Sequence, residues 1–587
     1  VSNERIRFLR KRLSKKYRTA SFFCYCPSKN LYLRDAMTIN SKVRFKETTS
    51  QQAVLFPSNI GERIPENHPV RMVSQIVDHL NIDDILSGYK GGGTSSYHPR
   101  IMLKVLFYSY FNNIYSCRKI EKLLYENIYF MWLSGNSTPN FRTINDFRGK
   151  RLKGKIQDLF AHMVRLMSEL GFVSLNVQYI DGTKIEAASN RYTFVWKKSV
   201  EKNKSKLEKK IIEVLKEIDS AIDSDNNHQQ QEDEPGSIDS NELIKKIKKL
   251  NQHRQQMNKQ QEKQLKKLQQ EELTRLQKYE SQLQTCGERN SYSKTDPDAT
   301  FMRMKDDHMK NGQLKPAYNA QISTENQVVT SFSIHQRPGD TATLIPHLDQ
   351  FEQQHQQQSQ EIVADAGYGS EQNYQYAQEN NIEAFIKYNT FHKEQKQKYK
   401  QNPFLPDNLF YNPEQDYMVC PMGQKMRCIG IKKRESELGY TSSLHIYQAA
   451  NCHACPMRGQ CHRGDGNRRI ELNHKLLKYR KKARENLMSE KGHMHRSKRP
   501  IEPEAVFGQI KFNNRFTRFT LRGLQKVEVE FGLVLISHNL RKILQSMLKG
   551  KYSSKNLGLL LNIITILIEL HIKTLLSKKF NSVAFNN

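Results

Sequence analysis

Apolar residues recur at helical spacing through residues 66–165, with clear runs at residues 73–80 and 101–110. This spacing places the apolar side chains of each run on one face of a helix. Short polar stretches such as GGGTSSYHP and SGNSTPNFRT separate the runs. The pattern predicts a small helical domain with a basic edge, and it leaves helix-turn-helix DNA binding and plain structural packing open as roles.

Two short apolar strands that each end in an aspartate follow this helical region. Residues 177–181 (VQYID) precede Gly182, and residues 362–365 (IVAD) precede a glycine-containing turn. Strand and helix patterns alternate between and after them, which predicts an α/β sheet domain with acids at strand ends. The further expected elements are strands at residues 318–323, 328–334 and 384–387 and a helix at about residues 342–354.

A charged, glutamine-rich segment at residues 196–283 separates the two parts of this α/β pattern. Its apolar residues form a ragged helical seam that is too narrow for a globular core. A polar break at residues 223–240, which contains HQQQ and EDEPGS, divides the seam. We therefore predict a helical hairpin or coiled coil inserted into the domain, with its turn or flexible tip at the break.

The charge of the chain narrows the classes of partner. Its 587 residues include 93 Lys plus Arg against 60 Asp plus Glu, which gives a formal net charge of +33. Such an excess disfavours a typical metabolic enzyme and favours a polyanionic partner, chiefly nucleic acid or an anionic membrane surface. The apolar run at residues 557–570 is shorter than the roughly 20 residues of a membrane span. We therefore expect a packed terminal helix there, with a membrane anchor as the alternative.

Residues 1–36 carry ten basic and two acidic side chains but no signal-peptide pattern. Because Met37 begins a stretch that is typical of a natural start, we interpret residues 1–36 as upstream read-through or a disordered basic arm. The nine cysteines are ordinary usage for this length and are unevenly placed. They favour a reduced, cytoplasmic compartment over a disulfide scaffold.

Asp181 and Asp365 lie where sheet proteins place catalytic groups, although a single aspartate at a strand end is usually a turn residue. Paired carboxylates are suitable ligands for Mg²⁺, and two such ions can hold the attacking and leaving oxygens of a phosphodiester. This chemistry needs a third carboxylate. We predict it at Glu504, because Pro503 favours a helix start there, with Glu502 as the alternative.

Basic residues surround the predicted Glu504 helix. Lys511 lies two turns beyond Glu504 on nearly the same face, so we predict that it contacts DNA phosphate; a surface salt-bridge helix is the alternative. Residues 467–550 hold 20 basic against seven acidic side chains, and they flank the proposed carboxylates on both sides. A charge run is usually a solvated face, but this position favours a DNA-binding channel. The DNA-binding residues that this pattern predicts are Lys511, Arg515, Arg518 and Arg522.

Several short runs occur in one order along the chain and are specific in combination. They are residues 179–187 (YIDGTKIEA), 295–299 (TDPDA), 305–319 (KDDHMKNGQLKPAYN), 363–368 (VADAGY), 504–511 (EAVFGQIK) and 537–540 (SHNL). With these runs the sequence resembles, from about residue 55 to residue 545, the DDE transposases of bacterial insertion sequences, in the large group related to the IS4 type.

The resemblance implies an RNase H-like fold, with Asp181 on the first strand, Asp365 at the fourth and Glu504 on a following helix. It implies that these acids hold two Mg²⁺ or Mn²⁺ ions, which activate a water or a 3′-hydroxyl and stabilise the leaving oxygen. The implied partners are double-stranded DNA, as element ends and target, and a second copy of the chain in the transposition complex. The implied location is the bacterial cytoplasm, at the nucleoid.

The same family carries a Tyr-x2-Arg-x3-Glu-x6-Lys signature, which this chain keeps in part. Glu504 and Lys511 match, whereas Pro500 stands at the Arg position and Ser497 at the Tyr position. Arg499 or the neighbouring Lys498 could make the phosphate contact instead.

Cysteines cluster between the last predicted strand and the Glu504 helix. The pair Cys452-x2-Cys455 is followed by Cys461, and either Cys420 or Cys428 could complete a tetrahedral thiolate set for zinc. We predict a structural Zn²⁺ on Cys420, Cys452, Cys455 and Cys461, with incidental free cysteines as the alternative.

Together these patterns predict an α/β RNase H-like catalytic core with an N-terminal all-α domain, a helical coiled-coil insertion and a Cys-rich insertion. The predicted function is a DDE transposase, and the alternatives are a metal-dependent nuclease of the same fold or a catalytically inactive DNA-binding derivative. The predicted segments are residues 1–36 (basic segment), 37–165 (helical DNA-binding domain), 170–196 (first part of the core), 197–287 (coiled-coil insertion), 288–395 (second part), 396–466 (Cys-rich insertion), 467–545 (third part, with the Glu504 helix) and 546–587 (tail).

Overall fold

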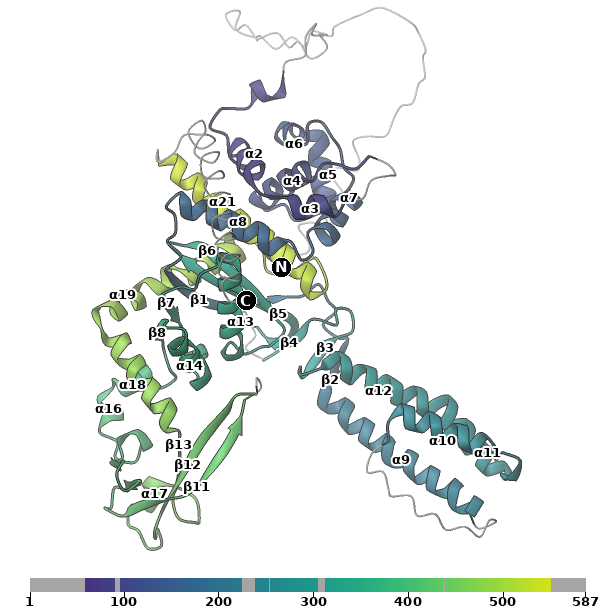
Figure 1. Cartoon of the computed structure of the whole chain (residues 1–587), viewed down its shortest axis with the longest axis vertical. Coiled ribbons are helices and arrows are strands. Elements are labelled where there is room, and N and C mark those ends of the chain that lie inside the picture. The colour runs from purple at the N-terminus through teal and green to yellow at the C-terminus, as the bar shows by residue number, and fades with distance from the viewer. Residues whose placement is uncertain are drawn as a thin grey trace, which may run out of the picture. The chain divides into compact units, whose positions relative to one another are not determined.

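The computed structural model describes residues 59–89, 95–223, 238–252, 254–304, 312–436 and 439–549 (Figure 1). The predictions for residues 1–36 and for the apolar run at 557–570 lie outside these residues. Within the described ranges, no helix has both the length and the apolar character that a membrane crossing requires.

The first described part of the chain is helical, as its periodicity predicts. It contains α2 (Pro69–His79), α3 (Asp83–Ser87), α4 (Pro99–Phe111), α5 (Cys117–Glu126), α6 (Ile128–Ser134), α7 (Phe141–Asp146) and α8 (Ile156–Glu169).

A His-Pro pair begins both α2 and α4. The imidazoles of His68 and His98 each accept a hydrogen bond at 3.2 Å from a backbone N–H two residues further on, at Val70 and Arg100. The proline at the first helical position has no N–H to satisfy, and its φ already suits a helix. The two helix starts are therefore fixed by local sequence.

These helices share one hydrophobic core with the sheet and with the long helix α21 (Leu524–Leu548). The buried side chains of Val73 in α2, Leu106 in α4 and Phe160 in α8 belong to the same cluster as those of Phe332 and Val534. Phe160 and Phe332 meet edge to face with ring centroids 5.0 Å apart. The predicted boundary after residue 165 thus falls inside a continuously packed region.

A mixed sheet of six strands follows. Five of them lie at the predicted positions, and β4 (Thr300–Arg303) was not predicted. Along the sheet the order is β4-β5-β1-β7-β8, and β6 pairs with β5. β5 is antiparallel to β1 and β6, whereas β7 is parallel to β1 and β8 is parallel to β7. The strands are β1 (Val177–Glu186), β4 (Thr300–Arg303), β5 (Leu314–Glu325), β6 (Val328–His335), β7 (Glu361–Ala364) and β8 (Glu383–Ile386). The helices between them are α13 (Leu344–His355) and α14 (Glu371–Glu379), and α15 (Phe391–Glu394) and α16 (Gln397–Lys400) follow β8.

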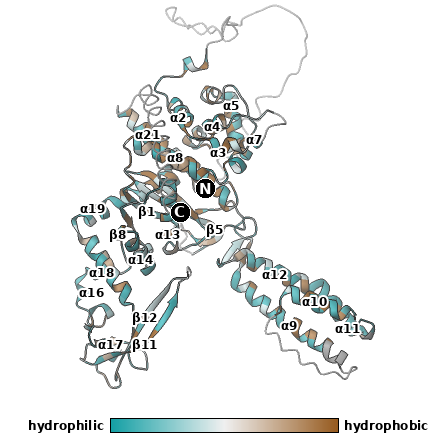
Figure 2. Cartoon of the chain, viewed as in Figure 1, coloured by the Kyte–Doolittle hydropathy of each residue, from teal (hydrophilic) through white to brown (hydrophobic). Residues whose placement is uncertain are grey.

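The segment after β1 is a separate helical unit with its own buried cluster, which includes Ile211 and Leu268. Its first helix is antiparallel to the returning chain, because Lys204 lies 3.9 Å from Glu280 whereas Lys210 lies 2.8 Å from Glu272. Figure 2 shows this unit as mainly hydrophilic, in keeping with a narrow apolar seam. Its elements are β2 (Phe194–Trp196), α9 (Lys197–Asp223), α10 (Ser240–Gln252), α11 (Lys259–Lys267), α12 (Leu273–Cys286) and β3 (Ser291–Ser293), with a π-helical turn at Leu268–Glu272.

The predicted two-helix hairpin therefore has a third helical stretch, since α10 is separate from the α11–α12 stretch and packs on α12. The predicted tip lies almost entirely outside the described residues.

The Cys-rich region forms a second sheet, in the order β13-β12-β11-β10-β9. The strands are β9 (Tyr411–Asn412), β10 (Tyr417–Val419), β11 (Lys425–Glu435), β12 (Thr441–Ala449) and β13 (Arg469–Leu472), and α17 (Arg458–Cys461) lies between the last two. The helices α18 (His474–Met488), α19 (Glu490–Lys498) and α20 (Pro503–Gly508) then lead to α21.

Candidate active site

The register of two parallel strands brings Asp181 and Asp365 together. Tyr179 in β1 lies opposite Val363 in β7, and each aspartate follows two residues later in its own chain segment. Side chains two residues apart in an extended chain point to the same side of a sheet. The two aspartates therefore lie beside each other. Asp365 directly follows β7, as predicted, whereas Asp181 lies inside β1, which continues to Glu186 beyond its predicted end because these residues pair with β5.

Gly182 follows Asp181 because the space beside this part of β1 is filled. A Cβ at Gly182 would overlap the side-chain amide of Gln321 and lie 2.9 Å from Asp340 Oδ1. The Gln321 amide donates a hydrogen bond to that Asp340 oxygen at 3.1 Å, and Tyr368 donates its hydroxyl proton to Gln321 Oε1. Asp340 is thus a fourth carboxylate near the pair, which the sequence analysis did not select.

The Arg499 guanidinium lies among all three predicted acids. Its Nη1 donates to Glu504 Oε1 at 2.6 Å, and its Nη2 lies 3.5 Å from Asp181 Oδ1 and 3.8 Å from Asp365 Oδ2. The Arg499 side chain is 8% exposed, whereas those of Asp365 and Glu504 are 51% and 47% exposed. The three carboxylates therefore face one point, at which a positive group already lies.

The local sequence around Glu504 sets this arrangement. A short 3₁₀ turn, Arg499–Ile501, separates α19 from α20, and Pro503 opens α20 as predicted. Glu504 in the first turn of α20 reaches Arg499. Glu502 is 5% exposed and points elsewhere, since its Oε2 accepts a hydrogen bond at 2.8 Å from the backbone N–H of Gln327. The geometry thus favours Glu504 over Glu502 as the third acid.

Lys387 is a further residue beside the acids that the sequence analysis did not select. It directly follows β8, whose residue Ile386 pairs with Ala364, the neighbour of Asp365. Burial lowers the pKa of Lys387, and the charge of Asp365 partly offsets that effect. The available signal was its position, since Lys387 directly follows β8 as Asp365 directly follows β7.

Tyr368 is a fully buried hydroxyl near the same acids. Burial raises its pKa well above the usual value, and the charges of Asp340 and Asp181 raise it further. Its hydroxyl therefore stays protonated and acts as a donor, in agreement with its hydrogen bond to Gln321.

The other predicted DNA-binding residues differ in their surroundings. Lys511 is 9% exposed, and its Nζ donates to the backbone carbonyl of Lys184 at 3.2 Å. Arg518 donates to the carbonyl of Ser189 at 2.9 Å, and Arg522 donates to that of Ala188 at 2.7 Å. These three cations hold β1 and the loop that follows it. Arg515 is exposed.

The four cysteines predicted to bind zinc line one small cavity of about 20 Å³ together with Arg468. The guanidinium of Arg468 donates to Cys461 Sγ at 2.9 Å, and its backbone N–H donates to Cys452 Sγ at 3.4 Å. Within the described residues, the side chains that bring at least three possible ligand atoms within 4.8 Å of one another are Asp416, Cys428 and His445. A zinc ion on the four cysteines stays a prediction.

Two family models match parts of the chain. One, described as Transposase DDE domain, matches residues 419–544, and the other, described as Transposase domain (DUF772), matches residues 58–150. Neither the comparison with curated proteins nor that with solved structures gives a match. The matches support a transposase of an insertion sequence. Arg499 and Glu504 lie within the first match, whereas Asp181 and Asp365 lie outside both.

Proposed function

We propose that this chain is a DNA transposase that binds the ends of an insertion sequence, cleaves them and joins them to target DNA. Asp181, Asp365 and Glu504 are the proposed catalytic carboxylates. The observation that carries the proposal is their convergence on the Arg499 guanidinium. The two transposase matches support the class of reaction.

The strand order supports an RNase H-like core for this site. Three antiparallel strands, β6, β5 and β1, are followed across the sheet by β7 and β8, which run parallel to β1. Asp181 lies on the central strand, Asp365 follows its parallel neighbour, and α20 packs against β1. This arrangement and the ordered sequence runs support placement in the IS4-related group.

The donor set fits a hard divalent cation such as Mg²⁺ or Mn²⁺. All three groups are carboxylates, and a positive side chain already occupies the point that they face. When bound, such ions activate the attacking oxygen and stabilise the leaving oxygen of a phosphodiester. Asp181, Asp365 and Glu504 would hold the ions, while Tyr368 and Gln321 fix the neighbouring Asp340.

An exposed basic face on α18 supports DNA binding by this chain. Lys478, Lys481 and Lys482 are exposed on this helix, which follows the second sheet and precedes the turn that carries Arg499. Exposed lysines can contact phosphates without reading the base sequence. We therefore propose that this face contacts the DNA phosphates, in addition to the predicted contact of Lys511. We also propose that two copies of the chain act together on paired element ends.

The test is an assay of the purified full chain with Mg²⁺ and DNA that carries the element ends. Joined products support transposition, cut but unjoined ends indicate a nuclease, and bound intact DNA indicates a non-catalytic binding protein. Asp181→Asn, Asp365→Asn and Glu504→Gln should each lower cleavage by at least about 100-fold while DNA binding persists.

The matched control is Glu352→Gln, which removes an exposed carboxylate on α13. It should cleave as the wild type does. Retained cleavage in any one of the three variants would remove that residue from the proposed catalytic set.

A further inference from the structure

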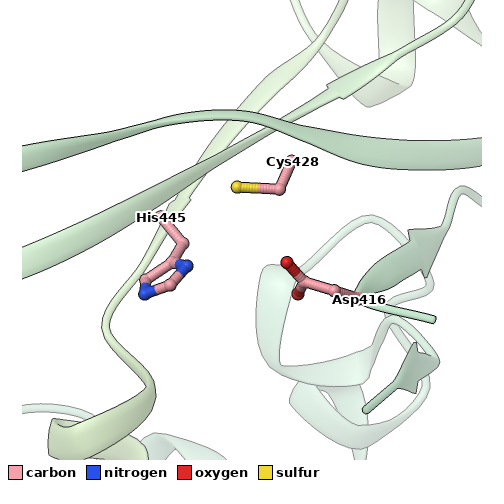
Figure 3. A group of neighbouring side chains, drawn as sticks. All are labelled: Asp416, Cys428 and His445. Atoms are coloured by element: carbon pink, nitrogen blue, oxygen red, sulfur yellow. The ribbon is translucent and has the colours of Figure 1, made fainter. Parts of the chain in front are cut away.

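Three potential metal ligands from separate parts of the second sheet meet outside the proposed catalytic site. Asp416, Cys428 and His445 each bring one ligand atom within 4.8 Å of the other two. Figure 3 shows the carboxylate, the thiol and the imidazole around a common space. Asp416 precedes β10, whereas Cys428 and His445 lie on the paired strands β11 and β12.

The strand pairing accounts for the approach of Cys428 to His445. Cys428 lies opposite Tyr447, which is two residues from His445 and therefore on the same face of β12. The register shifts between Cys428 and Gly430, so the bulge falls next to the cysteine. Such bulges redirect a side chain locally and often accompany functional sites.

Hydrogen bonds position Asp416 in the turn between β9 and β10. Its φ is +47°, a conformation that aspartate tolerates better than most residues do. Its Oδ1 accepts hydrogen bonds from the hydroxyls of Tyr411, at 2.9 Å, and Tyr447. The Tyr447 hydroxyl also lies 2.8 Å from His474 Nε2. With both tyrosines on Oδ1, the other oxygen, Oδ2, is the one available for a cation.

His445 supplies an independent observation. Its Nδ1 is buried and has no hydrogen-bond partner among the described residues. A buried polar atom without a partner is costly, so such an atom in a native protein indicates a missing water, ion or ligand. An unprotonated imidazole nitrogen beside a thiol and a carboxylate is a typical metal ligand.

We propose that Asp416, Cys428 and His445 bind one Zn²⁺ ion, with water in the fourth position. The set of one sulfur, one nitrogen and one oxygen donor matches the ligands that zinc accepts, and three protein ligands leave one tetrahedral position open. The Tyr411 and Tyr447 hydroxyls would orient the carboxylate, as outer-shell hydrogen bonds do in zinc sites. This site is distinct from the cavity lined by the four other cysteines and does not depend on the proposed transposase activity.

A zinc ion at this site would connect the turn between β9 and β10 to the β11–β12 hairpin of the second sheet, which has a small apolar core. The buried cluster of this sheet is small, and most of β11 is exposed. An ion that joins the turn before β10 to β11 and β12 would stabilise the sheet where its apolar core is weakest.

The experiment uses the full chain, stripped of metal under reducing conditions and titrated first with Co²⁺ as a spectroscopic probe and then with Zn²⁺. The wild type should bind zinc with a stoichiometry that Cys428→Ser and His445→Gln each lower by about one equivalent. The sulfur-to-cobalt absorption due to Cys428 should be lost in Cys428→Ser. Tyr447→Phe keeps nearly the same side-chain volume but removes the hydroxyl that donates to Asp416. It should weaken zinc binding about 10–100-fold.

The matched control is Cys455→Ser, which alters the other cysteine cavity and should leave this equivalent of zinc in place. Zinc lost from Cys455→Ser but kept by Cys428→Ser would overturn the proposal, as would a wild-type chain that binds none. Circular dichroism of each variant checks folding. If Cys428→Ser does not fold, unchanged zinc affinity in Tyr447→Phe decides against the site.

Discussion

Arg499 is the residue whose role the structure changes most. Its predicted role is a contact with DNA phosphate, and in the structure its guanidinium lies within 3.8 Å of Asp181, Asp365 and Glu504. Carboxylates that converge repel one another, and a cation between them offsets that repulsion. Arg499 is therefore an internal counter-ion for the candidate site.

Arg499→Gln should destabilise the protein mainly when divalent metal is absent. Loss of the charged hydrogen bonds should lower the free energy of unfolding by about 1–2 kcal/mol in metal-free buffer, a modest value because Asp365 and Glu504 are half exposed. Added Mg²⁺ should restore much of this loss, since it supplies positive charge at the same point. Urea unfolding with and without Mg²⁺ measures both quantities.

The control for this variant is Arg463→Gln, which removes an exposed arginine from the Cys-rich region. Its unfolding should match that of the wild type in both buffers. An equal loss of stability for Arg499→Gln with and without Mg²⁺ would argue against a shared cation position.

At the residue scale, sequence spacing predicted where the acids lie better than where the side chain of Lys511 lies. The strand patterns before Asp181 and Asp365 identify β1 and β7, and the parallel pairing of Tyr179 with Val363 then places the two aspartates side by side. The expectation that Lys511 shares a helix face with Glu504 assumed a regular α-helix. The chain instead forms a π-helical turn at Gln509–Asn513, which adds a residue to the turn and directs Lys511 to the Lys184 carbonyl.

At the scale of elements, the sequence predicted every strand of the main sheet except β4, and it predicted the helical unit after β1 only in part. The β5–β6 hairpin lies where it was predicted, but β5 (Leu314–Glu325) extends beyond the predicted 318–323 at both ends, whereas β6 (Val328–His335) agrees with the predicted 328–334 to within one residue. In α9–α12 the apolar seam is continuous enough to predict helices but not how many pack together. The third stretch, α10, joins the same buried cluster through Leu243 and Ile247. Residue spacing does not predict which helices pack together in this way.

Ile211→Ala should destabilise this helical unit without affecting the main sheet. Ile211 is fully buried in a cluster separate from the main core, so its truncation should cost about 2–4 kcal/mol locally. Hydrogen exchange should quicken in α9, α11 and α12 and stay unchanged in β1 and β5. Ile212→Ala, the same substitution at the partly buried next position, should have a clearly smaller effect.

At the scale of the whole molecule, the composition indicates a polyanionic partner. It does not predict which helices and strands share one hydrophobic core. The helices before β1 share their buried cluster with β5, β6 and α21, which are far away in sequence. The Cys-rich sheet and the α9–α12 unit have separate clusters. Apolar period predicts which face of an element is buried, but which elements share a core depends on tertiary contacts.

Five buried or partly buried histidines should make the free energy of unfolding decrease at acid pH. Burial lowers the pKa of His347 to about 3 and those of His162, His335, His355 and His538 to about 4, from an ordinary value of 6.5. Above pH 6.5 these imidazoles are neutral in both the folded and the unfolded chain, so they have no effect. As the pH falls from 6.5 toward 4, these imidazoles become protonated in the unfolded chain but stay neutral in the folded chain. The free energy of unfolding therefore decreases.

His347→Gln should therefore reduce the acid sensitivity of the fold. His347 is fully buried, and its ring nitrogens lie 2.7 Å from the hydroxyl of Ser323 and 2.8 Å from that of Ser333. Its contribution to the stability lost between pH 7 and pH 5 should be at most about 2 kcal/mol. Only the unfolded chain protonates this imidazole between pH 6.5 and pH 5, and each of these roughly 1.5 pH units is worth about 1.4 kcal/mol. The variant should be less stable at pH 7, where those hydrogen bonds are altered, but its free energy of unfolding should decrease less between pH 7 and pH 5.

Urea unfolding at the two pH values measures the difference, and the exposed His453→Gln variant should follow the wild type. An identical pH dependence for His347→Gln and the wild type would mean that His347 is not held neutral by burial.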